Sequence, residues 1–145
     1  MAEKGLSREE SVRAESAPAK AWLAAAAAWL VPGAGHLLQG RVLRGLLLGG
    51  AVWAMFIIGL RLGGHLFPLA GPYDDGLSTL LQVPPVIANL GAGVLYLFCL
   101  LTRTGFTDQA SLATYEYGNT FLLVAGLLNY LIMLDAFDIG AGRKP

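Results

Sequence analysis

Long apolar windows without a charged residue alternate with short polar segments along most of this chain. Four windows contain no Asp, Glu, Lys or Arg: 21–40, 45–60, 76–102 and 117–134. A run of 18 or more mostly apolar residues is long enough to cross a bilayer as a helix. The pattern therefore predicts an integral membrane protein made of helices.

The windows, with the glycines and prolines that flank them, predict four helices. These are expected at about 17–31, 41–62, 84–102 and 115–137. Pro84 and Pro85 are placed in the first turn of the third helix, where a missing N–H costs least. The predicted fold is an all-α membrane protein, a four-helix transmembrane bundle, with a flexible charged tail at 1–15 and a single membrane domain at 16–142.

The first helix admits two interpretations. Its 15 residues would measure roughly 22 Å, which is short against a hydrocarbon core of about 30 Å. It is either a short spanning helix, anchored by Trp22 and Trp29, or a re-entrant element that dips into the bilayer and returns. A re-entrant turn must be buried in protein or line a wet cavity. We favour four spans, because short spanning helices are commoner.

Alternation of four spanning helices predicts which charges share a side of the membrane. Arg41 and Arg44 are expected on the same side as Glu116, whereas Asp135 is expected with Arg61 on the other side. With the tail in the cytoplasm, seven Lys/Arg lie inside and three outside, whether the first helix spans or returns. The positive-inside rule therefore does not choose between the two interpretations.

The overall composition agrees with a membrane location. Hydrophobic residues make up 55% of the chain and charged residues 14%, against about 25% charged residues in soluble domains. Ten Lys/Arg balance ten Asp/Glu, which gives no reason to expect a nucleic acid partner. The expected location is the cell (inner or plasma) membrane, crossed several times, with the lipid bilayer as the first partner.

A glycine-rich turn between the first two windows carries the one constellation with candidate chemistry. Its expected structural turn residues are Pro32, Gly33, Gly35 and Gly40. Arg41 and Arg44, three residues apart, share a helix face near His36. Such a group can hold a lipid phosphate or another anion.

Glu116 is expected to complete this candidate anion or lipid-headgroup site by pairing with His36, Arg41 or Arg44. A bidentate arginine–carboxylate pair suits a half-dry interface. The alternative is structural: the glycines make the turn, His36 caps it, and the arginines anchor the chain at the interface.

The residues of this turn also carry a resemblance. Gly-x-Gly-His followed by Gly-Arg resembles the hairpin turn of the two-helix transmembrane hairpin domain found across bacteria and eukaryotes. The pattern Pro-Gly-x-Gly-His-x-x-x-Gly-Arg-x-x-Arg-Gly at 32–45 is similar to that of uncharacterised small bacterial membrane proteins. The resemblance covers about residues 20–62 and implies a bacterial membrane protein; the two-helix domain has no established enzymatic activity to carry over. Leu37-Leu38-Gln39 stand where the two-helix domain usually has an aromatic pair.

Apolar and small residues recur at spacings of three and four along the last helix and predict its packed face. That face is expected to contain Asn119, Leu123, Gly126, Tyr130, Met133 and Phe137. Asn129 lies near the middle of the helix and is expected to hydrogen-bond to a neighbouring helix, which is worth about 0.6–2 kcal/mol.

Three functions remain open from the sequence. The favoured one is a non-enzymatic assembly or accessory subunit that packs with a second copy or another membrane protein through faces rich in Gly and Ala. The alternatives are a transporter or channel component working as an oligomer, and a lipid-headgroup-binding protein or membrane enzyme using the Gly/His/Arg turn. The chain contains no catalytic triad pattern, HExxH or GxxxxGK[ST] motif. His36 and His65 are expected on opposite sides of the membrane, so no metal or cofactor is expected.

Overall fold

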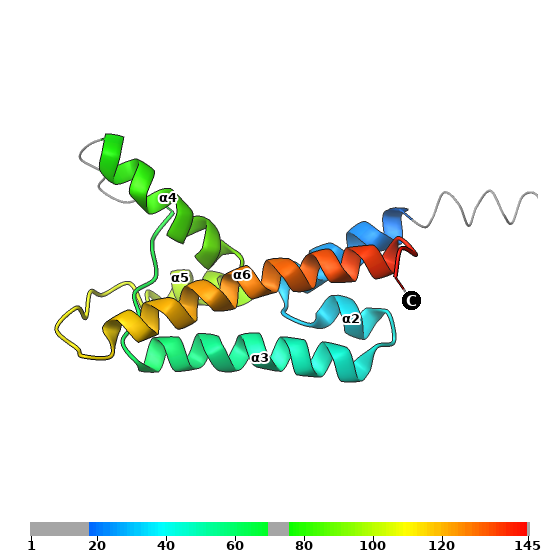
Figure 1. Ribbon diagram of the computed structural model, residues 1–145, viewed down its shortest axis with the longest axis horizontal. Coiled ribbons are helices and arrows are strands. Elements are labelled where there is room, and N and C mark those ends of the chain that lie inside the picture. Colours follow the sequence, from blue (N-terminus) through cyan, green and yellow to red (C-terminus); the bar gives the residue numbers. More distant parts are fainter. Residues whose placement is uncertain (1–17, 70–75, 145) are drawn as a thin grey trace, which may run out of the picture.

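The computed structural model describes residues 18–69 and 76–144, and these form helices joined by short turns and loops (Figure 1). The helices are 18–30, α2 (Ala34–Leu38), α3 (Val42–Arg61), α4 (Gly76–Leu90), α5 (Val94–Thr102) and α6 (Tyr115–Gly140). The described residues contain no strand, so the predicted all-helical class is confirmed. The charged tail expected at 1–15 lies outside the described residues.

The helices α3 and α6 lie side by side and run in opposite directions (Figure 1). Both are long and apolar enough to cross a membrane, and among the described residues they are the only continuous helices that are. A side chain at Gly59 of α3 would collide with Leu122 of α6. The close approach of these two helices therefore depends on a small residue, as expected from the sequence.

The first helix, 18–30, does not run the full length of α3 and α6, and it forms a hairpin with α2. Residues 18–30 start with Ala21 against Gly140, near the end of α6, and reach the middle of α6 at Trp29. The chain turns at Gly33, whose φ of 90° suits glycine, and α2 returns toward the end of α6. This path has the shape of the re-entrant interpretation and not of the spanning one that we favoured. Thirteen helical residues rise only about 20 Å, and Pro32 ends the helix before it can cross.

The expected helix 84–102 is also broken. Residues Leu80–Leu90 and Val94–Thr102 form two helices that meet at an angle of 112°. The first of them, α4, begins at Gly76, so Pro84 and Pro85 lie inside it and not at its start. The apolar residues before the prolines extend the helix upstream, and the bend falls instead near Gly93, whose φ is 60°.

The two breaks meet at the middle of α6. The side-chain Nδ2 of Asn129, which is fully buried, donates to the carbonyl oxygens of Trp29 at 2.9 Å and Gly91 at 2.8 Å. Carbonyls at the end of a helix have no partner within it, and an apolar surrounding makes that costly. The Asn129 amide therefore satisfies one carbonyl oxygen at each of the two breaks. The predicted hydrogen bond from Asn129 to a neighbouring helix is confirmed.

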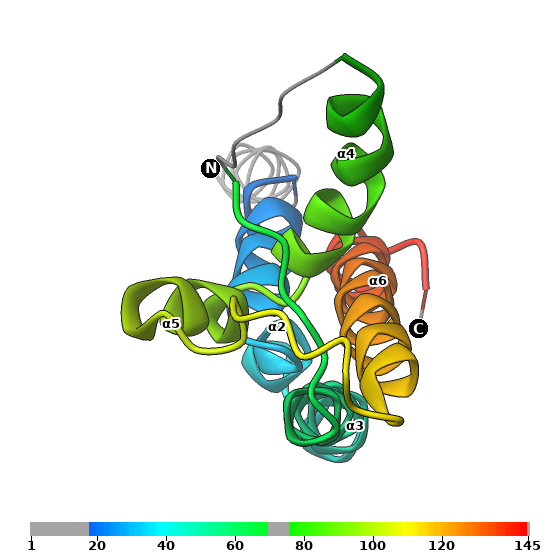
Figure 2. The ribbon, with the colours of Figure 1, turned by 90° about the vertical axis from the view of Figure 1, so that its left-hand side faces the viewer.

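The bend at α4–α5 changes which charges lie together. Because α4 and α5 are joined by this sharp bend, α6 starts at the same end of the bundle as the end of α3, where Gly59 and Gly64 lie against Gly118. We call this the Glu116 end and the opposite one, where α2 meets the last turns of α6, the His36 end; Figure 2 views the bundle from the Glu116 end. The alternation of sides expected from four spanning helices is therefore wrong.

The apolar core lies between α3, α5 and α6, around Val52, Phe56, Tyr96 and Leu122. The buried face of α6 is Gly118, Leu122, Ala125, Gly126, Asn129, Ile132 and Ala136. The expected face had the right spacing but was rotated by about one residue. Most of its members are half-buried at the edge of the true interface, and only Gly126 is in its centre.

Candidate functional site

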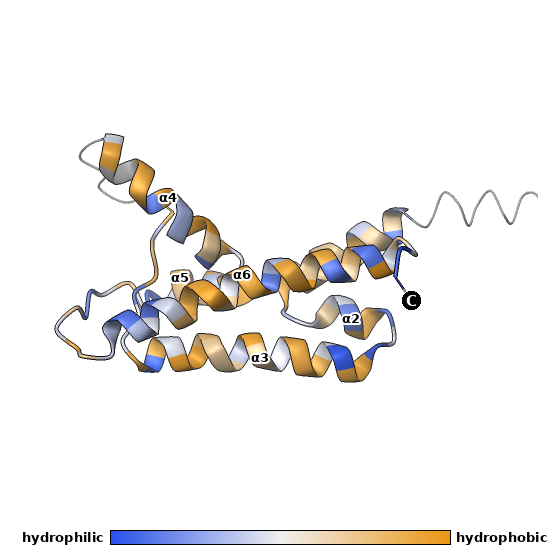
Figure 3. Ribbon diagram, in the orientation of Figure 1, coloured by the Kyte–Doolittle hydropathy of each residue, from blue (hydrophilic) through white to orange (hydrophobic). Residues whose placement is uncertain are grey.

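Ionisable side chains gather at the His36 end, where α2, the start of α3 and the end of α6 meet. Figure 3 shows polar residues there and an apolar stretch along the middle of α3 and α6. The short α2 begins directly after the Gly33 turn, and this register points His36 and Gln39 toward α6. The turn therefore positions the site.

His36 is fully buried, and its Nε2 lies 2.9 Å from Oδ2 of Asp135. Beside it, Nε2 of Gln39 donates to the carbonyl oxygen of Ala136 at 2.8 Å. Both contacts join the re-entrant hairpin to α6, about one hundred residues later in the chain. The His36 and Gln39 contacts thus hold the hairpin against α6.

Three cations surround the same acidic end of α6. Lys144 Nζ lies 3.0 Å from Oδ1 of Asp135, and Arg44 Nη1 lies 3.8 Å from its Oδ2. Arg143 and Lys144 lie 3.4 and 3.7 Å from Asp138. The hydrogen bond with Asp135 and the charge of that carboxylate raise the pKa of Lys144. Asp135 therefore contacts His36, Arg44 and Lys144 at once, and lies at the centre of the cluster.

The residues expected to form the turn lie in three different places. Pro32 and Gly33 are in the turn after the first helix, Gly35 is inside α2, and Gly40 is in the turn before α3. A side chain at Gly33 would collide with the Gly45 carbonyl of α3, and one at Gly35 with the Ala24 carbonyl of the first helix. A side chain at Gly40 would meet nothing within 4 Å.

Glu116 does not join His36, Arg41 or Arg44, and the predicted pairing is wrong. It lies in the first turn of α6, nineteen residues before Asp135 and thus about 28 Å away along the helix. Asp135 takes the place that we expected for Glu116, because the bend of α4–α5 reverses the direction of α6. The signal for Asp135 was a carboxylate at the edge of a long apolar window, which is an uncommon and often functional position.

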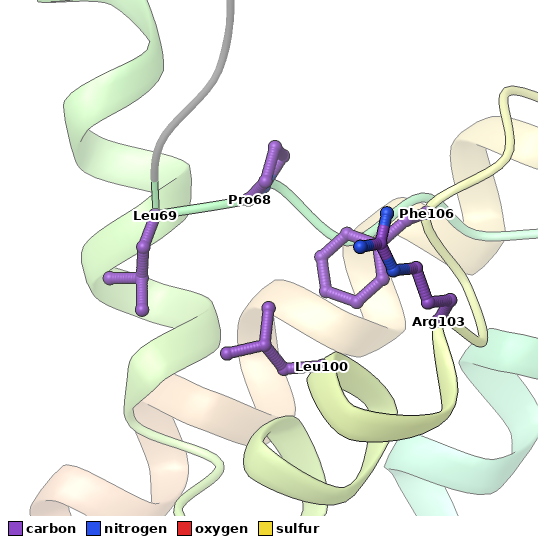
Figure 4. Close-up of a pocket in the computed structure, with 5 residues that line it drawn as sticks. All are labelled: Pro68, Leu69, Leu100, Arg103 and Phe106. Atoms are coloured by element: carbon purple, nitrogen blue, oxygen red, sulfur yellow. The ribbon is translucent and has the colours of Figure 1, made fainter.

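Surface hollows lie near arginines at both ends of the bundle. At the His36 end, a hollow of about 480 Å³ is lined by Gly40, Arg41, Val42, Leu43 and Arg44. At the Glu116 end, a hollow of about 560 Å³ is lined by Pro68, Leu69, Leu100, Arg103 and Phe106 (Figure 4). The first has two arginines in its lining, which suits an anion. Over residues 18–69 and 76–144, no three His, Cys, Asp or Glu are grouped as metal ligands.

Removal of the Asp135 carboxylate by Asp135→Ala is expected to lower the free energy of unfolding by about 1–3 kcal/mol, because it leaves the buried His36 without a partner. Asp138→Ala, one turn later, removes only exposed ion pairs and should cost under about 1 kcal/mol. Thermal unfolding of both variants in detergent measures the difference. Equal losses would show that the His36–Asp135 contact is energetically unimportant.

Comparison with protein families gives one match. Residues 23–145 match the model described as "Family of unknown function (DUF6677)". The match covers most of the first helix, the Gly33 turn, both long helices α3 and α6, and the His36–Asp135 contact. Comparisons with curated proteins and with solved structures give no match.

Proposed function

The chain belongs to this family of unknown function, and from its structure we propose that it is a multi-pass protein of the cell membrane that acts as a non-enzymatic assembly or accessory subunit. The helices α3 and α6 cross the bilayer. The two helix pairs that are interrupted by a break, 18–30 with α2 and α4 with α5, enter the bilayer from opposite faces and meet at Asn129. This arrangement is supported by the apolar middle of both long helices and by their polar ends (Figure 3).

The distribution of basic residues supports one orientation. Of the described Lys and Arg, five lie at the His36 end and two at the Glu116 end. The five are Lys20, Arg41, Arg44, Arg143 and Lys144, and the two are Arg61 and Arg103. Short segments rich in Lys and Arg stay in the cytoplasm. The His36 end therefore faces the cytoplasm.

One observation carries the assembly function: a pair of small residues on the outward face of α3. Gly45, Gly49 and Gly59 are buried against neighbouring segments of the same chain. Gly50 and Ala54 are instead exposed, and a side chain at Gly50 would meet nothing within 4 Å. Small residues four apart let a second helix approach closely in a bilayer. The pair is thus free to receive a helix of another subunit.

Gly50→Leu is expected to weaken this association by about tenfold or more, equal to about 1.4 kcal/mol, because the added side chain keeps the partner helix away. The fold should be unaffected, since the monomer has space there. Ala51→Leu is the matched control, because Ala51 is also exposed but lies a sixth to a third of a turn away from the pair. The measurement is the mass of particles extracted in native lipid.

The expected wild-type particle contains a second copy or one stoichiometric membrane-protein partner. Particles of Ala51→Leu should have the same mass, and those of Gly50→Leu should contain one chain. A wild-type particle of one chain and lipid alone would overturn the assembly function.

A second function is favoured by Asn89, which lies just before the α4–α5 break. Its side chain is 1% exposed, and neither of its polar atoms has a hydrogen-bond partner among the described residues. Broken helices near the bilayer middle form the polar sites of many transporters. Flux of water or glycerol into vesicles containing the protein, lost in Asn89→Leu, would replace the assembly function by a transport function.

A further inference from the structure

Beside the hollow at the start of α3 lies a second, shallow hollow with an apolar lining on the same helix, which we call the apolar groove. The hollow of about 480 Å³ contains Arg41, Leu43 and Arg44 in its lining. A second hollow of about 290 Å³ is lined by Leu43, Arg44, Leu47 and Leu48. The two share Leu43 and Arg44, so a basic region and an apolar region follow one another down one side of α3.

Two of the apolar side chains in this groove are turned away from the protein. Leu43 is 73% exposed and Leu47 is 65% exposed. On a helix that spans the bilayer, these positions face hydrocarbon, while the arginines above them lie at the depth of the headgroups. The groove therefore has the polarity of a single phospholipid molecule, with its phosphate above and an acyl chain below.

The two arginines differ in how far they are already neutralised. Arg41 is half-buried, and its guanidinium makes no ion pair with any described residue. Arg44 is 3.8 Å from Asp135, but this carboxylate already lies 2.9 Å from His36 and 3.0 Å from Lys144. With the basic residues in excess around Asp135, the hollow has an unmatched positive charge.

We propose that Arg41 and Arg44 bind the phosphate of an anionic phospholipid of the cytoplasmic leaflet, with one acyl chain along Leu43, Leu47 and Leu48. Guanidinium groups suit this ligand because they hold a phosphate by paired, charge-assisted hydrogen bonds. This inference rests on the membrane orientation proposed above. It does not depend on the assembly function, because the lipid is held within one chain.

Native mass spectrometry tests the site, because one spectrum reads the number of chains and the number of retained lipids separately. The protein is extracted and mixed with phosphatidylglycerol or with phosphatidylcholine at low salt. The expected result is one phosphatidylglycerol retained per chain, in preference to phosphatidylcholine. The double variant Arg41→Gln/Arg44→Gln should lower that preference by about thirtyfold.

Two further variants locate the site. Arg61→Gln removes an exposed arginine from the other end of α3 and should leave the preference unchanged. Leu47→Ala keeps both arginines but shortens the groove, so it should weaken retention of phosphatidylglycerol if an acyl chain lies there. Thermal unfolding shows that each variant is folded before its lipids are counted.

Inorganic phosphate distinguishes the two sources of the same chemistry. It should not displace phosphatidylglycerol at equal concentration, because it lacks the acyl chain. Displacement by phosphate, or an unchanged result in Leu47→Ala, would overturn the lipid in favour of a free anion. Equal losses in Arg61→Gln and the double variant would overturn the site altogether. The number of chains per particle decides the assembly function independently.

Discussion

Cysteines introduced by Arg41→Cys and Lys144→Cys will react with a membrane-impermeant maleimide from the same side of the membrane, and one introduced by Asp108→Cys from the opposite side. The structure places Arg44 and Lys144 around one carboxylate, that of Asp135. Asp108 lies in the exposed segment before α6, at the Glu116 end. The difference in labelling is expected to be all-or-none, because α3, which we propose to span the bilayer, places about 30 Å between the His36 end and the Glu116 end.

The labelling also reads the orientation. In intact cells only position 108 should react, and positions 41 and 144 should react after permeabilisation, because the basic His36 end is cytoplasmic. The background is Cys99→Ala, which removes the single native cysteine, a buried one. Reaction of 41 together with 108, and apart from 144, would restore the four alternating spans and remove the bend at α4–α5.

Gly126→Leu is expected to lower the free energy of unfolding by about 3 kcal/mol or more, or to prevent folding. A side chain at Gly126 would collide with the carbonyl oxygen of Ala88, at the place where α4 lies against α6. The rigid backbone there has no room to yield. Separating α4 from α6 would also weaken the hydrogen bond from Asn129 to Gly91.

Ala51→Leu is the matched control, since it adds a large side chain in the middle of the other long helix, α3. Ala51 is exposed and lies outside the Gly50–Ala54 pair that we propose as the assembly surface. Thermal unfolding of both variants in detergent should show a large loss for Gly126→Leu and little change for Ala51→Leu. Similar melting of Gly126→Leu and Ala51→Leu would mean that α4 does not pack against Gly126.

The breaks inside windows 21–40 and 76–102 could not be predicted from the sequence. Uncharged windows report the length of an apolar segment but not its path, so 21–40 and 76–102 looked like spans. Each contains a break, near Gly33 and Gly93, where φ is positive. A glycine permits such a turn without requiring it. Whether the chain turns depends on what receives the freed carbonyls, and here that is Asn129, far along the sequence.

The candidate site could be predicted only in part, for the same reason. His36, Arg41 and Arg44 are close in sequence, so their grouping on one turn could be predicted. Their acidic partner could not, because the choice between Glu116 and Asp135 depends on the direction of α6. That direction is set by the path of α4–α5, and one bend reverses it. The phase of the α6 face was missed for a related reason: Leu122 and Ala125 are buried because α3 and α5 pack there.

The helical class, the approximate bounds of α3 and α6, their apolar length and the glycine turn all follow from the amino-acid sequence alone. These follow from local quantities: apolar length, charge spacing, and the backbone preferences of Gly and Pro. The folded structure was needed to show that only α3 and α6, among the described residues, are unbroken helices long enough to span, that the breaks near Gly33 and Gly93 meet at Asn129, and that His36 pairs with Asp135. Such choices depend on contacts between residues about forty to one hundred positions apart, and no local preference contains them.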